Sequence, residues 1–408
     1  MKYIIKKNNK NLIGEINLER SKSISNRVLI IDALCNQDIP ITGLSSSDDT
    51  NTMVQLLSAT STILDVGAAG TTMRFLTALK ASQEGTSCIL TGSDRMKQRP
   101  IKVLVDALRS IGAQIDYLEK DGYPPIKITG QALNVSHIKI DGGTSSQYIT
   151  ALLLIAPSLA NGMKLEIEGN LVSKPYVQMT LDIMSYFGID HVWDSNIITI
   201  AKQAYISKSY EVEADWSAAS YWYLMAGLSD HVDLKINGLT QPSLQGDSIL
   251  SQWFTYFGVR GNFEGNSVQL SKDADLTIKG LDLDFILCPD IAQSFACLYA
   301  GLGLSGKFKG LQTLRIKETD RTLALKQELI KHDYNIDINS DEEISLKGAL
   351  SESNIAIDTY EDHRMAMSFA PLAITLGSIE INEPMVVTKS YPAYWEDLKS
   401  VGFDIEEV

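Results

Sequence analysis

The sequence repeats one pattern, in which an amphipathic helix ends at a glycine or a polar residue and leads directly into a strand of alternating apolar and polar residues. A glycine at this place is a common helix end, so the regular spacing carries the information. The spacing is about 70 residues and predicts a mixed α/β architecture built from similar units. The turn residues of five copies are Gly112, Gly188, Gly258, Asn335 and Gly402.

A weaker, earlier copy at residues 53–66 brings the number of units to six. Six such units in 408 residues exceed what one hydrophobic core usually organises. We therefore expect two domains of three units, with a boundary near residues 208–220, where a new strand and helix begin. On this reasoning alone, the N-terminal strand could belong to either domain.

Charge limits the possible ligands. The chain has a net charge of -14, and many of its Lys and Arg residues lie in short clusters rich in Ser and Gly. Binding of nucleic acid needs a broad basic face, so these clusters indicate small, dense anions such as phosphates and carboxylates. The clusters are SKSISNR (21–27), AAGTTMR (68–74), DRMKQRP (94–100), RIKETDR (315–321) and EDHRMAM (361–367).

The first two clusters have the pattern of helix starts. In SKSISNR, Lys22 and Arg27 would add charge to the free backbone N–H groups of a helix N-terminus, although a simple Ser cap with solvated cations is the alternative. In AAGTTMR, Gly70 permits close backbone approach to a phosphate, and Thr71 and Thr72 are expected to cap the following helix. Neither a GxxxxGK[ST] loop nor a convincing GxGxxG pattern occurs in the sequence, which argues against nucleotide hydrolysis and nicotinamide binding.

RIKETDR places two cations, Lys317 and Arg321, beside two carboxylates, Glu318 and Asp320. Its alternative interpretation is a solvated, ion-paired helix start. Asp290 lies in an apolar setting, CPDIAQSFA, where we expect burial to raise its pKa and suit it to act as a base.

Two further segments add polar groups at expected helix starts. The segment TSSQYIT offers neutral donors that suit a phosphate or a sugar-like hydroxyl, although many such starts are only caps. EDHRMAM places a His and an Arg before an apolar helix, and a late Lys precedes a Pro and several aromatic residues. The residues concerned are Ser145, Ser146, Gln147, His363, Arg364 and Lys389.

The sequence has no pattern of a targeting or membrane segment. MKYIIKKNNK lacks the apolar core of a signal peptide, and the longest apolar stretch, residues 148–160, is too short for a bilayer and contains Pro157. We expect a buried helix there and a cytoplasmic protein.

Taken in order, these clusters resemble the 5-enolpyruvylshikimate-3-phosphate (EPSP) synthases, or 3-phosphoshikimate 1-carboxyvinyltransferases, a family of enolpyruvyl transferases. The resemblance covers nearly the whole chain, and so many ordered matches are far more specific than any one of them. The matching patterns are SKSxSNR, AGTxMR, DxRMKxRP, SSQxxTALL, SKPY, PDxA, KETDR and DHRMAM, followed by Lys389.

The resemblance implies a two-domain α/β fold, an inside-out barrel in which each domain holds three βαβαββ units. Domain I would contain residues 1–18 and 212–408, and domain II residues 19–211. Hinges near 14–20 and 208–215 would let the domains close over substrates. The implied protein is a monomer that needs no metal or organic cofactor.

By the same resemblance, the reaction transfers the enolpyruvyl group of phosphoenolpyruvate to the 5-hydroxyl of shikimate 3-phosphate and releases phosphate, in the route to chorismate and the aromatic amino acids. Glyphosate is the expected inhibitor. Glu318 would donate a proton, Asp290 would act as base, and Lys22 would stabilise charge. The residues implied for shikimate 3-phosphate are Lys22, Ser23, Arg27, Ser145, Ser146, Gln147, Ser173, Tyr176, Asp290 and Lys317, and those for phosphoenolpyruvate are Lys22, Gly70, Arg95, Arg321, Arg364 and Lys389.

Departures from the family pattern leave room for other functions. Glu19-Arg20 replaces a Pro-Gly, Ala68 replaces an Asn, and Thr313 replaces an Asn that can contact shikimate. One alternative is the related UDP-N-acetylglucosamine enolpyruvyl transferase, which has a Lys-Asn pair and usually a loop Cys. A second is a non-catalytic relative that binds an anionic metabolite.

Overall fold

Each of the six repeated patterns folds as a helix followed by a strand. Four of the turn glycines have positive φ angles, as the helix ends require. In the remaining clear copy, Asn335 lies inside the strand, and the left-handed turn is taken by Asp333 (φ 64°), whose short polar side chain tolerates it. The pairs are α2 (Asp48–Leu57) with β4 (Ile63–Asp65), α4 (Lys102–Ser110) with β6 (Gln114–Tyr117), α6 (Lys174–Tyr186) with β10 (Val192–Asp194), α8 (Leu250–Trp253) and η4 (Phe254–Phe257) with β14 (Val259–Glu264), α10 (Arg321–Leu329) with β18 (Tyr334–Ile338), and α13 (Tyr394–Ser400) with β21 (Asp404–Glu407).

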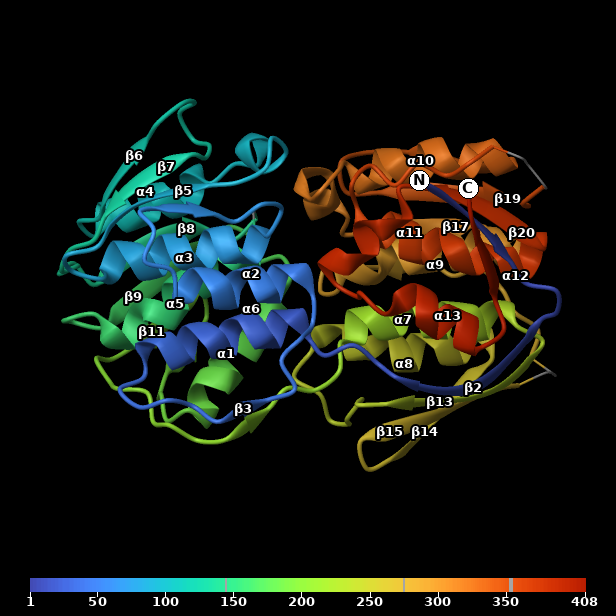
Figure 1. The fold of residues 1–408 in the computed structure, drawn as a ribbon, viewed down its shortest axis with the longest axis horizontal. Coiled ribbons are helices and arrows are strands. Elements are labelled where there is room, and N and C mark those ends of the chain that lie inside the picture. Colours follow the sequence, from blue (N-terminus) through green and yellow to red (C-terminus); the bar gives the residue numbers. More distant parts are fainter. Residues whose placement is uncertain (144, 274–275, 352–354) are drawn as a thin grey trace. The chain divides into compact units, whose positions relative to one another are not determined.

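The computed structural model describes residues 1–143, 145–273, 276–351 and 355–408. They form two compact units: unit 1 contains Met1–Arg20 and Glu213–Val408, and unit 2 contains Ser21–Val212. Figure 1 shows the N-terminal strands of unit 1 beside C-terminal elements of the same unit. In unit 1, β1 (Lys2–Lys6) lies between β20 (Ser378–Asn382) and β21, and β2 (Asn11–Asn17) pairs in parallel with β13 (His231–Asn237).

Four sheets of the described chain share one strand order. In each, the first strand pairs in parallel with the second, the second pairs antiparallel with the fourth, and the fourth forms a hairpin with the third. The shared order confirms the predicted α/β class with repeated units. The sheets are β4-β5-β7-β6, β10-β11-β9-β8, β14-β15-β13-β2 and β16-β17-β19-β18, with β5 (Ser87–Thr91), β7 (Ile126–Thr129), β8 (His137–Asp141), β9 (Met163–Glu168), β11 (Ile197–Ile200), β15 (Ser267–Lys272), β16 (Leu283–Asp284), β17 (Gly306–Lys309) and β19 (Ile344–Gly348).

Helices form the interior of each unit, and the strands cover them. Helix α7 of unit 1 is apolar on all sides and almost wholly buried, which is the pattern of a central helix. The strands alternate between buried and exposed residues, as in β9, so one face of each sheet meets the core and the other meets solvent. The other inner helices are α9 (Ala292–Leu302) and α11 (His363–Phe369) in unit 1, and α1 (Lys22–Leu34), α3 (Gly70–Ser82) and α5 (Ser146–Ile155) in unit 2; α7 spans Trp216–Leu228.

The predicted buried helix within residues 148–160 is confirmed as α5, which continues into the 3-10 turn η2 (Ala156–Ser158). Among the described residues, none of the helices is both long and apolar enough to cross a lipid bilayer.

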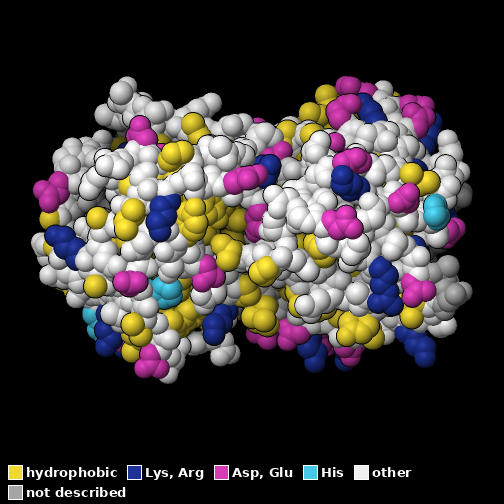
Figure 2. Space-filling model, turned by 90° about the horizontal axis from the view of Figure 1, so that it is seen from below, with side chains coloured by type: hydrophobic (Ala, Val, Ile, Leu, Met, Phe, Trp, Pro, Cys, Tyr) yellow, Lys and Arg dark blue, Asp and Glu magenta, His cyan; other side chains and the backbone are white. Residues whose placement is uncertain are grey.

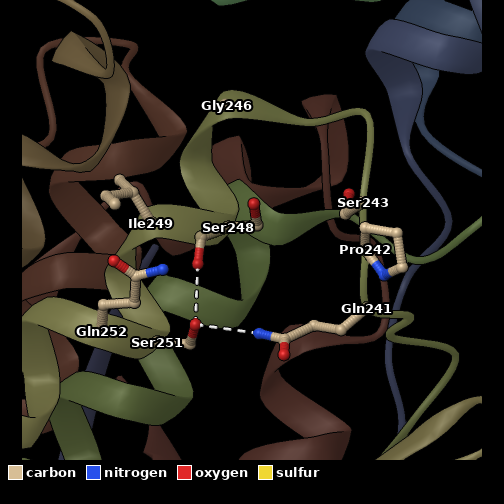
Figure 3. Close-up of a pocket in the computed structure, with 8 residues that line it drawn as sticks. All are labelled: Gln241, Pro242, Ser243, Gly246, Ser248, Ile249, Ser251 and Gln252. Atoms are coloured by element: carbon tan, nitrogen blue, oxygen red, sulfur yellow. Dashed lines mark hydrogen bonds between the residues drawn. The ribbon is translucent and has the colours of Figure 1, made fainter.

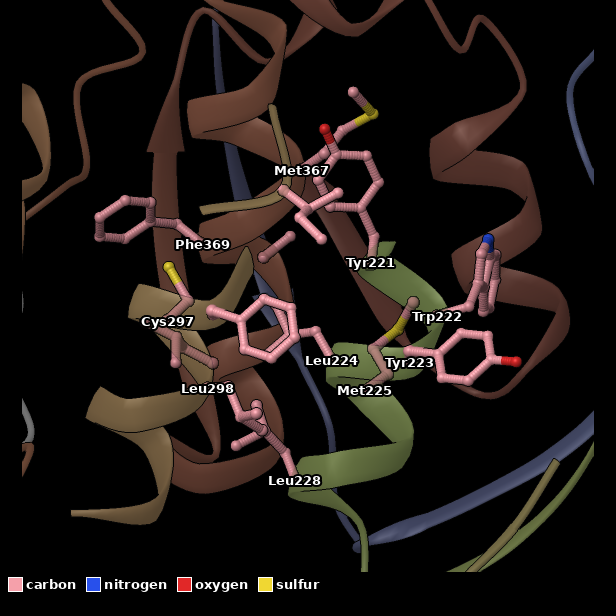
Figure 4. Packing of buried hydrophobic residues seen from close by; sticks show 14 of the residues in the cluster. Tyr221, Trp222, Tyr223, Leu224, Met225, Leu228, Cys297, Leu298, Met367 and Phe369 are labelled. Atoms are coloured by element: carbon pink, nitrogen blue, oxygen red, sulfur yellow. The ribbon is translucent and has the colours of Figure 1, made fainter. Parts of the chain in front are cut away.

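The core of unit 1 is rich in aromatic residues, among them Tyr221, Trp222 and Tyr223 of α7, which Figure 4 labels. Helix α9 adds Phe295 and Tyr299. Phe295 of α9 is fully buried, and its ring lies 4.7 Å from that of Phe254 and 5.6 Å from that of Phe285, measured between centroids. Such a ring contributes through both apolar burial and edge contacts.

Replacing Phe295 by alanine is expected to lower the free energy of unfolding of unit 1 by about 3–5 kcal/mol, because it leaves a cavity inside a close-packed aromatic cluster. Phe295→Leu, which keeps part of the volume, should lose less. Denaturant unfolding followed by tryptophan fluorescence measures this, since four of the five tryptophans belong to unit 1. An unfolding midpoint equal to that of the unmodified protein would contradict the packing described.

Candidate active site

Helix N-termini of unit 2 are tied to one another by polar contacts. Lys22, the first residue of α1, lies 3.1 Å through its Nζ from the Oδ2 of Asp49 in α2. The carbonyl of Asp49 accepts a hydrogen bond from Thr72 of α3 at 3.2 Å, and Gln147 of α5 donates to Thr71 Oγ1 at 3.3 Å. Thr71 and Thr72 therefore join neighbouring helices. Our prediction that they cap α3 is wrong, because α3 already starts at Gly70.

Arg27 of unit 2 is a buried cation whose described hydrogen bonds go to neutral oxygens. Its Nε donates to Thr180 Oγ1 at 2.8 Å, and its Nη1 donates to the carbonyl of Ser23 at 2.7 Å. Its Nη2 lies 3.4 Å from both Thr150 Oγ1 and the carbonyl of Tyr176. Burial lowers the pKa of Arg27 to about 10. A buried guanidinium hydrogen-bonded to neutral oxygens suits a bound anion.

Two further arginines lie at the N-terminus of α3. Arg74 and Arg99 are 4% and 7% exposed, and Arg74 Nη1 donates to the carbonyl of Gly70 at 3.0 Å. A Cβ atom added at Gly70 would lie 2.6 Å from Arg99 Nη1 and 3.2 Å from Arg74 Nη1. The absence of a side chain at Gly70 thus allows two guanidinium groups to approach the helix start.

The remaining predicted residues of unit 2 lie at helix starts. Ser145 caps α5 by accepting a hydrogen bond from the Gln147 N–H at 3.3 Å. Ser173 precedes α6 in a left-handed conformation (φ 54°) without a side-chain cap hydrogen bond. Ser146 is the first residue of α5, and half-buried Arg95 precedes the short 3-10 helix η1 (Met96–Gln98).

A second cluster, in unit 1, is organised by Arg321, the first residue of α10. Only 2% of the Arg321 side chain is exposed, and it contacts three carboxylates. Its Nε lies 2.7 Å from Asp362 Oδ2, its Nη2 lies 2.9 Å from Glu318 Oε2, and its Nη1 lies 3.1 Å from Asp290 Oδ1. RIKETDR is therefore part of a buried ionic network, and the alternative of a solvated helix start is wrong.

Asp290, in the 3-10 helix η5 (Pro289–Ile291), is surrounded by cations. Its Oδ1 lies 3.1 Å from Lys317 Nζ, and its Oδ2 lies 3.3 Å from Arg364 Nη2. Burial alone would raise the pKa of Asp290, but Lys317, Arg364 and Arg321 outweigh it and hold the pKa well below its usual range. Our expectation of a raised pKa is wrong, since these cations come from distant segments that the local sequence does not reveal.

Glu318 joins the last predicted cation to the network. Its Oε1 lies 3.1 Å from the Nζ of Lys389, which ends the 3-10 helix η9 (Pro384–Lys389). Within unit 1 the fold therefore brings together all six predicted residues of that unit. They are Asp290, Lys317, Glu318, Arg321, Arg364 and Lys389.

Sequence reasoning missed three carboxylates close to these cations. Asp49 pairs with Lys22, and Asp362 pairs with Arg321 and also caps α11 by accepting from the Arg364 N–H at 2.9 Å. Asp247 is buried and accepts a hydrogen bond from Ser217; burial, and then the nearby charge of Asp290, raise the pKa of Asp247 to about 6. Of these three carboxylates, only Asp362 lies inside one of the recognised motifs, DHRMAM, and could have been found from the sequence.

The departures from the family pattern lie in varied settings. Ala68 is exposed, and Thr313 is 7% exposed, with no hydrogen-bond partner for its Oγ1 among the described residues. The Glu19 carbonyl accepts a hydrogen bond from the Asp215 N–H at 2.8 Å, so Glu19-Arg20 lies in the ordered connection of unit 1.

A pocket of about 570 Å³ in unit 1 differs chemically from these clusters (Figure 3). Its lining is neutral, and Gln241 donates to Ser251 Oγ at 3.1 Å across it. The lining residues are Gln241, Pro242, Ser243, Gly246, Ser248, Ile249, Ser251 and Gln252.

On the face shown in Figure 2, the described Lys and Arg side chains are scattered among Asp and Glu side chains. This distribution agrees with the net negative charge of the chain. Several Arg and Lys side chains of the clusters described above are buried.

The repeated sheets, the inward-facing helices and the buried ionic clusters at helix starts define an α/β protein of two similar units. A family model described as EPSP synthase (3-phosphoshikimate 1-carboxyvinyltransferase) matches residues 6–62 and 58–398. The chain belongs to the EPSP synthase family, as the motifs predicted.

Similar proteins agree with this assignment. The chain is 46% identical over 394 residues to the 3-phosphoshikimate 1-carboxyvinyltransferase of Bacteroides fragilis, with 96% of each chain covered. It is 37% identical over 418 residues to the enzyme of that name from a Sulfurovum species, covering 95% of this chain and 96% of the relative. The solved structure of EPSP synthase from Acinetobacter baumannii has the same fold, with a TM-score of 0.77, 20% identity and full coverage of both chains.

Proposed function

We propose that the protein transfers the enolpyruvyl group of phosphoenolpyruvate to the 5-hydroxyl of shikimate 3-phosphate and releases phosphate. The observation that carries the proposal is the buried network in which Asp290 and Glu318 are held among Lys317, Arg321, Arg364 and Lys389. Membership of the EPSP synthase family supports the choice of substrates. We further propose a cytoplasmic monomer.

Shikimate 3-phosphate would bind chiefly through neutral donors and one buried guanidinium. The described hydrogen bonds of the Arg27 guanidinium go to neutral oxygens, so a phosphate that approaches it need not break an ion pair. The hydroxyl and amide groups at the starts of α5 and α6 suit ring hydroxyls. The proposed residues are Lys22, Ser23, Arg27, Ser145, Ser146, Gln147, Ser173, Tyr176, Asp290 and Lys317.

Phosphoenolpyruvate, with its phosphate and carboxylate, needs several fixed cations. Arginine matches both groups bidentately, and the absence of a side chain at Gly70 lets Arg99 and Arg74 approach the start of α3, where a helix N-terminus favours a phosphate. The closing motion about residues 14–20 and 208–215 stays a prediction. The proposed residues are Lys22, Gly70, Arg95, Arg321, Arg364 and Lys389.

Substrate binding would change the chemistry of Asp290. In the structure, three cations hold its pKa low, which makes it a weak base. When anionic substrates share Lys317, Arg321 and Arg364, their pull on Asp290 weakens and its pKa rises toward the value that a general base needs. Asp290 then takes the proton of the 5-hydroxyl as the new C–O bond forms.

Glu318 would deliver the proton to the methylene carbon of phosphoenolpyruvate, and Lys22 would stabilise charge at the reacting group. The addition gives a tetrahedral product. Loss of phosphate from this product, with removal of a proton from the same carbon, restores the double bond. The overall exchange therefore needs no oxidant or reductant.

The test is release of phosphate from phosphoenolpyruvate that depends on shikimate 3-phosphate. Release with UDP-N-acetylglucosamine alone would identify the related transferase. Absence of release with either acceptor, in protein that still binds phosphoenolpyruvate, would identify a non-catalytic relative.

Glyphosate is expected to compete with phosphoenolpyruvate, and Gly70→Ala should weaken glyphosate more than the substrate. The new methyl group must displace Arg99, which narrows the site, and glyphosate is one atom longer than phosphoenolpyruvate between phosphorus and carboxyl carbon. We expect the inhibition constant to rise about tenfold or more, a typical cost for a misfit of this size. Steady-state inhibition at limiting phosphoenolpyruvate measures it. Unchanged activity at millimolar glyphosate would contradict the proposal.

A further inference from the structure

The segment that leads into α11 has an unusual backbone. Tyr360 and Glu361 have φ angles of 53° and 56°, so two consecutive residues with side chains adopt the left-handed conformation that favours glycine. Asp362 follows directly and contacts Arg321, and Arg364 lies two residues further on and contacts Asp290. A strained segment of this kind persists only where its surroundings hold it in place.

Helix α10 holds this segment at two points. At the start of α10, Arg321 Nε lies 2.7 Å from Asp362 Oδ2. Near its end, Glu328 Oε1 accepts a hydrogen bond from the Tyr360 hydroxyl at 2.5 Å, and Glu328 Oε2 accepts one from the Asp358 N–H at 2.9 Å. The segment from Asp358 to Asp362 is therefore fixed along α10 at both ends.

Burial and ion pairing stabilise the hydrogen bond between Tyr360 and Glu328. The Glu328 side chain is fully buried, and Lys331 Nζ lies 2.5 Å from its Oε2, so its charge is paired. Burial, and then the hydrogen bond to Glu328, raise the pKa of the Tyr360 hydroxyl well above its usual value, so the hydroxyl remains a donor. Gln327 Oε1 is a second acceptor, 3.0 Å from the same hydroxyl.

We infer that Tyr360 and Glu328 are positioning residues for the proposed reaction. They hold the left-handed turn that sets the start of α11, and through it they place Asp362 against Arg321 and Arg364 against Asp290. Neither residue belongs to the set proposed to touch substrate. The expected loss of kcat/KM rests on the proposed function. The anchoring of the turn by Tyr360 and Glu328 does not depend on it.

The test is Tyr360→Phe, which removes one hydroxyl and keeps the ring. Without its anchor the turn relaxes, and kcat/KM for phosphoenolpyruvate should fall about tenfold, since small displacements of positioned groups have effects of this order. The KM for shikimate 3-phosphate should change much less, because most of its proposed groups belong to unit 2. Glu328→Gln, which keeps one of the two acceptor oxygens that Tyr360 and Asp358 use, should be milder than Glu328→Ala, which removes both.

The matched control is Tyr334→Phe, which also loses one hydroxyl hydrogen bond in unit 1, donated to the Leu304 carbonyl at 2.6 Å, but lies outside the charged network. Both variants should lose similar thermal stability. Only Tyr360→Phe should lose kcat/KM and show faster amide hydrogen exchange in residues 358–364.

Equal kcat/KM in the two variants would overturn the inference. If the unmodified protein catalysed no transfer, the proposed function would fail, and exchange would decide the inference alone. Unchanged protection of residues 358–364 in Tyr360→Phe would then overturn it.

Discussion

Replacing Asp290 by asparagine is expected to lower turnover by about 10³-fold, within the range typical of a lost general base. Asparagine has nearly the same shape but cannot take a proton from the 5-hydroxyl. The change also leaves Lys317, Arg321 and Arg364 with one negative charge fewer, which costs stability because these cations are largely buried. Binding of shikimate 3-phosphate, measured by calorimetry, should remain and would show that the variant is folded.

Asp284→Asn is the matched control for this experiment. Asp284 is exposed in unit 1, and its Oδ1 accepts a hydrogen bond from the Ile286 N–H at 2.9 Å, which an asparagine oxygen can also accept. Its turnover should equal that of the unmodified protein. Full turnover in Asp290→Asn would remove the catalytic role of Asp290.

The pH dependence of Asp290→Asn provides a second comparison. A carboxylate whose pKa is lowered on folding stabilises the native state above its unfolded pKa, and this stability is lost as pH falls through the lower folded pKa. Asp290 should therefore keep its charge in the free protein under all mildly acidic conditions. Removing it should lower stability equally from about pH 5 to pH 8.

Glu318→Gln is expected to lower turnover by about 10²-fold or more, because an amide cannot deliver a proton to carbon as a carboxylic acid does. Glutamine can still accept from Lys389 or Arg321, so the local packing should survive. Turnover is measured together with deuterium uptake at the methylene carbon of phosphoenolpyruvate in heavy water. Both should fall in the variant.

Glu343→Gln serves as its control, since Glu343 lies on the surface of unit 1, 3.8 Å from Lys307 and 3.7 Å from Lys309. Deuterium uptake in Glu318→Gln equal to that in Glu343→Gln would assign the proton transfer to another group.

Local sequence patterns predicted the elements well and their contacts poorly. A helix end such as the one at Gly188 needs a left-handed backbone conformation, and a glycine in the sequence indicates that conformation by itself. The contact of Arg321 with Asp362 joins residues 41 positions apart, and it depends on packing between separate elements. For the same reason, the apolar neighbours of Asp290 suggested a raised pKa, whereas cations from three other positions lower it.

The motifs predicted the family because many of them occur along the chain in the order that the family shows. RIKETDR followed by EDHRMAM in unit 1 is one example. They could not show that Thr71 and Thr72 join helices instead of capping one, since both roles use the same hydroxyl. Nor could they find Tyr360, whose importance comes from its backbone conformation and its contact with Glu328.

The most direct test is to offer phosphoenolpyruvate with either shikimate 3-phosphate or UDP-N-acetylglucosamine, to measure phosphate release, and to identify the product by mass. We expect release only with shikimate 3-phosphate and a product heavier than that acceptor by one enolpyruvyl group. Release only with UDP-N-acetylglucosamine, or none with either acceptor, would contradict it.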